Sequence, residues 1–218
     1  MKMRPYTAAN NKSTELRIIF KIFSSMRKEL GSLRALMFMV DFSKEQIRVV
    51  NRKFNCIKGG DKKVNRQLRY GVSLQAAFYI TLNKYLPEDK VWKYYEEMVE
   101  VAGVASLRRY MSPALDNKDA FARLKSLFQK TSEENKKAGI QDYEIYASND
   151  DDFQLNVTTC LFYEMLKELG IPESCHAACH CDHVFFDEYL KDAGIEFSRK
   201  YTLAKGDKFC DFCFKRMR

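Results

Sequence analysis

Residues 195–214 decide the fold class of this chain, and they read IEFSRKYTLAKGDKFCDFCF. Residues 195–203 and 209–214 alternate between apolar and polar side chains, which is the pattern of strands with one buried face. Between them lie residues 204–208, where Gly206 and Asp207 favour a turn. The stretch therefore predicts two antiparallel strands joined as a hairpin.

Two further segments upstream carry the same alternation. Residues 143–146 and 153–157 alternate as strands do, and the polar run 149–152 between them is typical of a turn. Because antiparallel strands with short connections pair with one another, these segments belong to the same small sheet.

Helices are expected among these strands. One begins near residues 158–159 and runs to Leu169, since Gly170, with Pro172 just beyond it, signals a helix end. Another is short and covers residues 185–190. The C-terminal part of the chain therefore mixes strands and helices.

The first 135 residues follow a helical period, with apolar side chains recurring every three or four positions. Helices are expected from residue 13 to a stop at Gly31, over 32–42, from Ser43 onward, over 73–85, from 88 onward, over 105–110 (ending before Pro113) and over 119–131. The sequence thus predicts an α+β protein, with a mostly helical N-terminal half followed by a small antiparallel β-sheet with helices. Residues 1–135 are the expected helical scaffold and residues 136–218 the α+β region of one compact domain.

Composition limits the partners to be expected. The net charge is +8, but acidic residues interleave with the 37 basic ones, so a solvated surface is expected and no nucleic-acid partner. No segment reaches the roughly 18 apolar residues that cross a bilayer, and no signal peptide is recognisable. A cytoplasmic protein with reduced thiols and no membrane partner is expected, and its seven cysteines cannot all pair. The oligomeric state is left open.

All three histidines and three of the seven cysteines lie within residues 175–183. Thiolates and imidazoles are ligands of zinc and iron. One candidate metal set therefore consists of Cys175, Cys179, His180, His183 and Cys213. Cys210 and Cys213 have the spacing of a zinc-binding pair, but they fall on opposite faces of the predicted strand, which hinders both thiols from reaching one metal. The alternative is a cysteine-rich loop with buried thiols.

The C-terminal third also carries an ordered series of motifs. They are NVTTC at 156–160, ELGIP at 168–172, CD at 181–182, GIEFSR at 194–199 and TLAKGDKFCDF at 202–212. In this order they resemble the L-2-amino-thiazoline-4-carboxylic acid hydrolase family over roughly residues 140–216, and the last string is the most specific.

The resemblance implies a hydrolase that opens the ring of a cyclic amidine, 2-amino-thiazoline carboxylate, to give an N-carbamoyl cysteine. A small-molecule substrate and no obligatory cofactor are therefore expected. The positions that match the pattern and become candidate catalytic residues are Cys160, Cys181, Asp182, Cys210 and Asp211. Cys175, Cys179, Cys213 and the histidines lie outside the pattern.

The chemistry of an amidine carbon then assigns roles. A thiolate at Cys181 or Cys160 could attack this carbon, or a carboxylate could activate water to do so. Because neighbouring residues of a strand point apart, we expect cross-pairing of Cys181 with Asp211 or of Cys210 with Asp182.

Other residues are expected to bind the substrate or to have only structural roles. Arg199 could hold a substrate carboxylate through two hydrogen bonds, with Thr202 beside it. His183 could act as an acid or base near neutral pH. The alternatives are that the aspartates cap turns and that Cys160 is a buried packing residue.

A hydrolase acting on a cyclic amidine of thiazoline type, by cleavage of a C–N or C–S bond, is the leading hypothesis. The alternative is a metal-binding module for zinc or iron, or a thiol-redox or sensing module, without hydrolase activity. A third possibility is a family member that has lost catalysis and binds a small ligand or partner.

Overall fold

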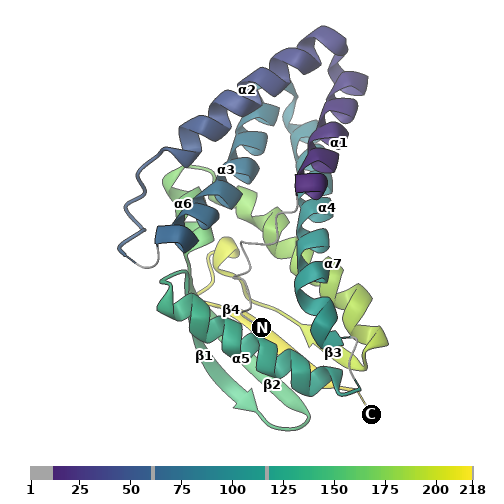
Figure 1. Cartoon of the computed structure of the whole chain (residues 1–218), viewed down its shortest axis with the longest axis vertical. Coiled ribbons are helices and arrows are strands. Elements are labelled where there is room, and N and C mark those ends of the chain that lie inside the picture. Colours follow the sequence, from purple (N-terminus) through teal and green to yellow (C-terminus); the bar gives the residue numbers. More distant parts are fainter. Residues whose placement is uncertain (1–11, 60–61, 116–117, 218) are drawn as a thin grey trace.

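The computed structural model of the chain describes residues 12–59, 62–115 and 118–217 (Figure 1). Long helices precede a four-stranded antiparallel sheet that lies in the C-terminal half, which confirms the predicted α+β class. The helices of the N-terminal half are α1 (Lys12–Leu30), α2 (Ser32–Val50), α3 (Lys62–Tyr85), α4 (Glu88–Leu115) and α5 (Ala120–Lys137).

Several predicted helix boundaries in this half are wrong. α3 begins at Lys62, not near residue 73, because Val64, Leu68 and Val72 already lie on its buried face. α2 continues through Ser43, where a new helix was expected, because the hydroxyl of Ser43 donates to the carbonyl of Met39 within the same helix. α4 is one helix to Leu115, because Leu107 and Met111 continue its buried face. The stop at Gly31 is confirmed, and its φ of +79° is a conformation that favours glycine.

The sheet has the order β1-β2-β4-β3, and all neighbouring strands are antiparallel. Its strands are β1 (Gln141–Ser148), β2 (Asp152–Cys160), β3 (Ile195–Ser198) and β4 (Cys210–Arg216). Two expectations are corrected here. β2 keeps residues 158–159 in the strand, so the following helix starts only at Leu161, and β3 ends at Ser198 instead of reaching residue 203.

β3 and β4 pair antiparallel as the predicted hairpin, but their connection, expected over residues 204–208, is a longer loop with a short 3-10 helix, η3 (Leu203–Lys205). Side-chain carboxylates hold this loop, because Asp211 accepts hydrogen bonds from the backbone N–H groups of Lys200 and Tyr201. Asp207 in the same way accepts from the backbone N–H of Thr202. These carboxylates take the N–H groups that a longer strand ladder would have used.

The cysteine-rich stretch is helical, which corrects the expected loop. After α6 (Leu161–Glu168) and the 3-10 turn η2 (Pro172–Ser174), helix α7 spans Cys175–Asp192, far beyond the short helix expected over 185–190. Its buried positions include Ala177, Cys181 and Phe185, which share one face at helical spacing. Residues 175–183 thus form the first turns of α7.

Aromatic side chains bind α5 and α7 to the sheet. Phe128 of α5 lies 4.8 Å from Phe214 of β4 between ring centroids, and Phe186 of α7 meets the same Phe214 edge-on at 5.5 Å. Both helices therefore cover the same face of the sheet (Figure 1). Among the described residues, no helix is long and apolar enough to cross a membrane. The division into two regions of one domain stays a prediction.

Candidate functional site

Arg199 is the centre of the most polar buried cluster. Its side chain is 2% exposed, and it leaves the sheet directly after β3. Its Nη1 donates to Asp182 Oδ2 at 2.6 Å, its Nη2 donates to the carbonyl of Cys179, and its guanidinium stacks 5.0 Å from the ring centroid of Phe212. The β3–η3 loop is thereby joined to the start of α7 by a buried ion pair.

The guanidinium keeps one unused donor. Arg199 Nε and the nearby hydroxyl of Thr202 are both buried and have no hydrogen-bond partner among the described residues. A buried polar group without a partner is costly, so it often marks the place of a ligand. Arg199 and Thr202 are the two residues expected to bind substrate, and they remain the best candidates for that role.

Cys179 lies one helical turn after Cys175 on the same face of α7. The hydrogen bond from Cys175 lowers the pKa of the Cys179 thiol, and Arg199 and Lys205 lower it further. The same hydrogen bond, together with burial, raises the pKa of Cys175. Burial and the Asp182 carboxylate oppose this lowering, so Cys179 is the more readily ionised thiol of the pair and Cys175 the hydrogen-bond donor to it.

Two other thiols from distant segments lie near this pair. Cys160 is the residue at which β2 passes into α6, as predicted, and burial raises the pKa of its thiol to about 11. Burial likewise raises the pKa of Cys210 to about 12, and its sulfur accepts the backbone N–H of Leu203 at 3.2 Å. Both ionisations respond to the charge of Cys179, which places the thiols around one site.

Asp182 and the histidines complete the surroundings. Burial raises the pKa of Asp182, although the ion pair with Arg199 opposes this effect. Burial also lowers the pKa of His183, and Arg199 lowers it further, which favours the neutral imidazole. His176 Nε2 lies 2.8 Å from the carbonyl of Ala204 and so links α7 to η3.

Cys181 lies on another side of α7. Its thiol donates to the carbonyls of Ala177 and Val99, at 3.2 and 3.4 Å, and burial raises its pKa to about 12. Asp211 holds the β3–β4 loop instead of facing a thiol. In the described part of the chain, no hydrogen bond joins Cys181 to Asp211 or Cys210 to Asp182, so the expected cross-pairings are absent.

The proposed metal set is spread over different faces. β2 and β4 pair in unbroken register from Asp152 to Val157, so Cys210 and Cys213 point to opposite sides of the sheet, as the strand pattern predicts. Within residues 12–59, 62–115 and 118–217, no three His, Cys, Asp or Glu side chains gather as metal ligands. Cys175, Cys179, His180, His183 and Cys213 therefore have no shared centre in this geometry.

A surface cleft of about 490 Å³ lies between α4 and α7, and no cysteine lines it. Arg108 and Tyr189 line it, with the guanidinium 5.1 Å from the centroid of the ring. The sequence singled out neither residue.

The pairing of Cys179 with Cys175 was missed, because Cys179 was placed only in the metal set. The signal that would have predicted the pair is the spacing of four residues between the two cysteines, which puts them on one face of a helix.

Comparison with known families agrees with this geometry. A profile of one protein family, described as L-2-amino-thiazoline-4-carboxylic acid hydrolase, matches residues 65–214, which is more than half of the 218-residue chain. The match spans α7, the β3–η3 loop and β4, and so includes every residue of the thiol cluster. No curated protein matches the sequence. The chain therefore belongs to the L-2-amino-thiazoline-4-carboxylic acid hydrolase family.

Proposed function

We propose that this protein hydrolyses a small cyclic amidine carboxylate of the thiazoline type, with Cys179 as the nucleophile. The observation that carries the proposal is that the buried Arg199 donates to the backbone carbonyl of Cys179 while its Nε has no partner in the described chain. A cation beside a thiol stabilises the thiolate, and a thiolate is the reactive form. Cys181, one of the two thiols considered as nucleophile from the sequence, donates to a backbone carbonyl within its helix, and burial raises its pKa to about 12.

The site offers two donors for a substrate carboxylate. Arg199 Nε and Thr202 Oγ1 are both buried and lack partners among the described residues. A carboxylate with its two oxygens could accept from both and would remove the cost of leaving them unpaired. The substrate ring would then lie over the thiols, with its amidine carbon near Cys179.

The reaction balances with water as the only co-substrate. Cys179 thiolate forms a bond to the amidine carbon, the ring C–S bond breaks, and the departing sulfur takes a proton from solvent. Water then attacks the same carbon and gives a proton to Asp182, while the bond to Cys179 breaks and regenerates the thiolate. Asp182 returns its proton to solvent. The raised pKa of Asp182 suits a carboxylate that accepts a proton transiently.

Turnover of 2-amino-thiazoline-4-carboxylate tests this proposal. Ring opening releases one thiol per substrate, which a thiol reagent quantifies while chromatography identifies the carbamoyl product. Cys179→Ala is expected to lower kcat/KM by about a thousandfold or more. Cys56→Ala is the matched control, because Cys56 is a half-buried thiol with its pKa raised to about 12 by burial. Full activity in Cys179→Ala, or loss of activity only in Cys181→Ala, would refute Cys179 as nucleophile.

A second candidate function is thiol-redox sensing, which the Cys175–Cys179 hydrogen bond favours. Hydrogen peroxide would oxidise the Cys179 thiolate to a sulfenic acid with release of hydroxide, and Cys175 would then displace water to form a disulfide. Peptide mapping after peroxide treatment tests for this bond. A disulfide that forms readily in a protein without ring-opening activity would favour sensing over hydrolysis.

A further inference from the structure

Helix α2 has two apolar faces, of which only one is buried. Ala35, Phe38, Phe42 and Val49 point into the core. On the other side stand large apolar residues that are more than half exposed: Leu33 (73%), Leu36 (54%), Met37 (54%), Val40 (53%) and Ile47 (60%). We call these five residues the α2 seam. Single exposed apolar residues are ordinary, but a continuous stripe of them marks an interaction surface.

The spacing of the seam is that of a coiled coil. Positions 33, 36, 40, 43 and 47 follow each other at intervals of three, four, three and four, and only Ser43 among them is polar. This repeat keeps the stripe on one line along the helix, so that it can interlock with a second helix of the same period. An amphipathic helix that packs against its own domain on one face has no need of a second such stripe.

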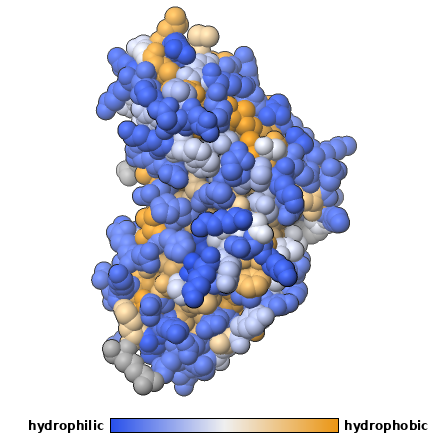
Figure 2. Space-filling model, turned by 180° about the vertical axis from the view of Figure 1, so that it is seen from behind, coloured by the Kyte–Doolittle hydropathy of each residue, from blue (hydrophilic) through white to orange (hydrophobic). Residues whose placement is uncertain are grey.

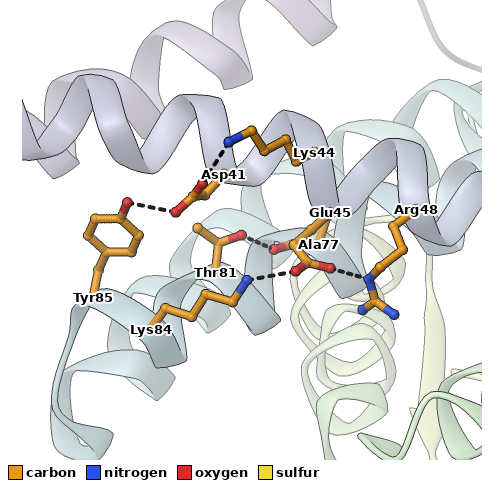
Figure 3. A network of polar contacts seen from close by, with 8 residues as sticks. All are labelled: Asp41, Lys44, Glu45, Arg48, Ala77, Thr81, Lys84 and Tyr85. Carbon is orange, nitrogen blue, oxygen red and sulfur yellow. Dashed lines mark hydrogen bonds and ion pairs between the residues drawn. The ribbon is translucent and has the colours of Figure 1, made fainter.

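Polar contacts with α3 fix which face of α2 points outward (Figure 3). Lys84 donates to Glu45 Oε1 at 2.6 Å, and the hydroxyl of Tyr85 donates to Asp41 Oδ2 at 2.9 Å. Arg48 donates to the other oxygen of Glu45. These contacts stand to one side of the seam, and rotating α2 to bury the seam would break the two that reach Lys84 and Tyr85 of α3.

We propose that the α2 seam pairs antiparallel with the α2 seam of a second copy of this chain, around a two-fold axis near Val40. Leu33 then packs against the partner's Ile47, and Val40 packs against the partner's Val40. Each Lys44 lies beside the partner's Leu36, over which its aliphatic stem can extend.

The size of the surface fits a self-associating pair. Figure 2 shows hydrophobic residues at the surface where α1 and α2 join. The five seam side chains would bury roughly 500 Å² per copy, against about 800 Å² per partner in a standard interface. The flanking polar stems would supply the rest. α1 and α2 also lie outside the family match at residues 65–214, so the seam belongs to the part of the chain not described by the family.

Sedimentation velocity of the full chain over a roughly hundredfold concentration range tests the proposal. A dimer is expected that dissociates on dilution, with a dissociation constant at least about a hundredfold higher in Val40→Glu, because two carboxylates would meet at the axis. Ile145→Glu is the matched control, since Ile145 is an exposed apolar residue on β1 (43%) away from the seam. Circular dichroism verifies that both variants stay folded.

A cross-linking experiment tests the antiparallel arrangement. Copies carrying Leu33→Cys are mixed with copies carrying Ile47→Cys and oxidised, and the linked peptides are identified by mass spectrometry. A disulfide between positions 33 and 47 supports the arrangement, whereas one between two copies of position 33 contradicts it. A monomer at all concentrations, a dimer unaffected by Val40→Glu, or a monomer that sediments with anionic vesicles would overturn the proposal.

Discussion

The sulfur of Cys181 occupies the space that a side chain on Gly103 would need, since a Cβ at residue 103 would lie 2.6 Å from Cys181 Sγ. α4 and α7 therefore approach most closely where one helix has glycine and the other a small thiol. Cys181 also donates to the carbonyl of Val99 on α4. The packing of α4 against α7 is enough to explain the position of the Cys181 side chain, and no catalytic role is needed to explain it.

Gly103→Ala is expected to lower the free energy of unfolding by about 1–3 kcal/mol, because the added methyl group overpacks the crossing. Combining it with Cys181→Ala should recover most of this loss, since the smaller side chain makes room. Urea unfolding of the four proteins of the double-mutant cycle measures the coupling.

Gly71→Ala on α3 is the control for helix propensity. A Cβ there meets nothing within 4 Å, so the substitution should stabilise by up to about 1 kcal/mol. Strictly additive effects of Gly103→Ala and Cys181→Ala would show that the two residues do not compete for space.

Cys179 should be the thiol that iodoacetamide alkylates first at neutral pH. Its pKa is lowered by the hydrogen bond from Cys175 and by Arg199, and its side chain is only partly buried. Cys181 and Cys210, with pKa values raised to about 12 by burial, should react slowly. Peptide mass spectrometry over a time course gives the order, and faster labelling of Cys213 would contradict it.

Arg199→Gln should destabilise the fold by about 3–5 kcal/mol, because it leaves the Asp182 carboxylate buried without its cation. Asp182→Asn in the same chain should recover part of this loss, since it removes the charge. Chemical unfolding measures both effects. Equal stability of the single and double variants would show that the ion pair contributes little.

The pH dependence of catalysis follows from the sign of the Cys179 pKa shift. In the proposed mechanism the thiolate is the active form, so kcat/KM should rise with pH through a pKa below the ordinary thiol value of about 8.5 and then level off. Thiolate formation also contributes stability that is present above the unfolded pKa and lost as the pH falls through the folded one. Arg199→Lys, which keeps the charge but loses the planar donors, should move the rise toward higher pH without removing it. An unchanged midpoint would contradict the role of the guanidinium.

Asp211→Ala should cost about 1–3 kcal/mol, because it removes the acceptor of two backbone N–H groups in the β3–β4 loop. Asp211→Asn keeps one acceptor oxygen, so it should retain much of the stability and its ring-opening activity. Thermal unfolding and turnover separate the two roles. An inactive but stable Asp211→Asn protein would support the catalytic role expected from the sequence.

The sequence predicted the elements whose signals are local. The stop at Gly31, the helix end at Gly170 and the alternation over residues 153–157 all appear as expected. The start of α7 was missed because one of its core positions is Cys181. In the sequence this cysteine was assigned a chemical role, so it was not counted among the apolar residues that mark the buried face of a helix. The hairpin of β3 and β4 was predicted, but its loop is longer than expected because Asp211 caps it from a distance of ten residues along the chain.

The candidate site was predicted in its parts but not in its arrangement. Asp182 and Arg199 were both named, yet their ion pair depends on the packing of α7 against β3. The pKa of Cys179 is lowered first by its helical neighbour Cys175, whereas the contribution of Arg199, 20 residues away in the sequence, depends on that packing. Sequence patterns predict contacts between residues that are close together in the chain, whereas the contacts of Arg199 with α7 join segments that are distant in the chain.

Because Arg199 directly follows β3, the reactivity of Cys179 can be used to follow the folding of the protein. α7 can form from its own residues, but Cys179 acquires its cation only when β3 pairs with β4 and carries residue 199 to the helix. During refolding, the circular dichroism signal of the helices and the alkylation rate of Cys179 would therefore report on different events. The alkylation rate of Cys179 would therefore report the time at which β3 pairs with β4.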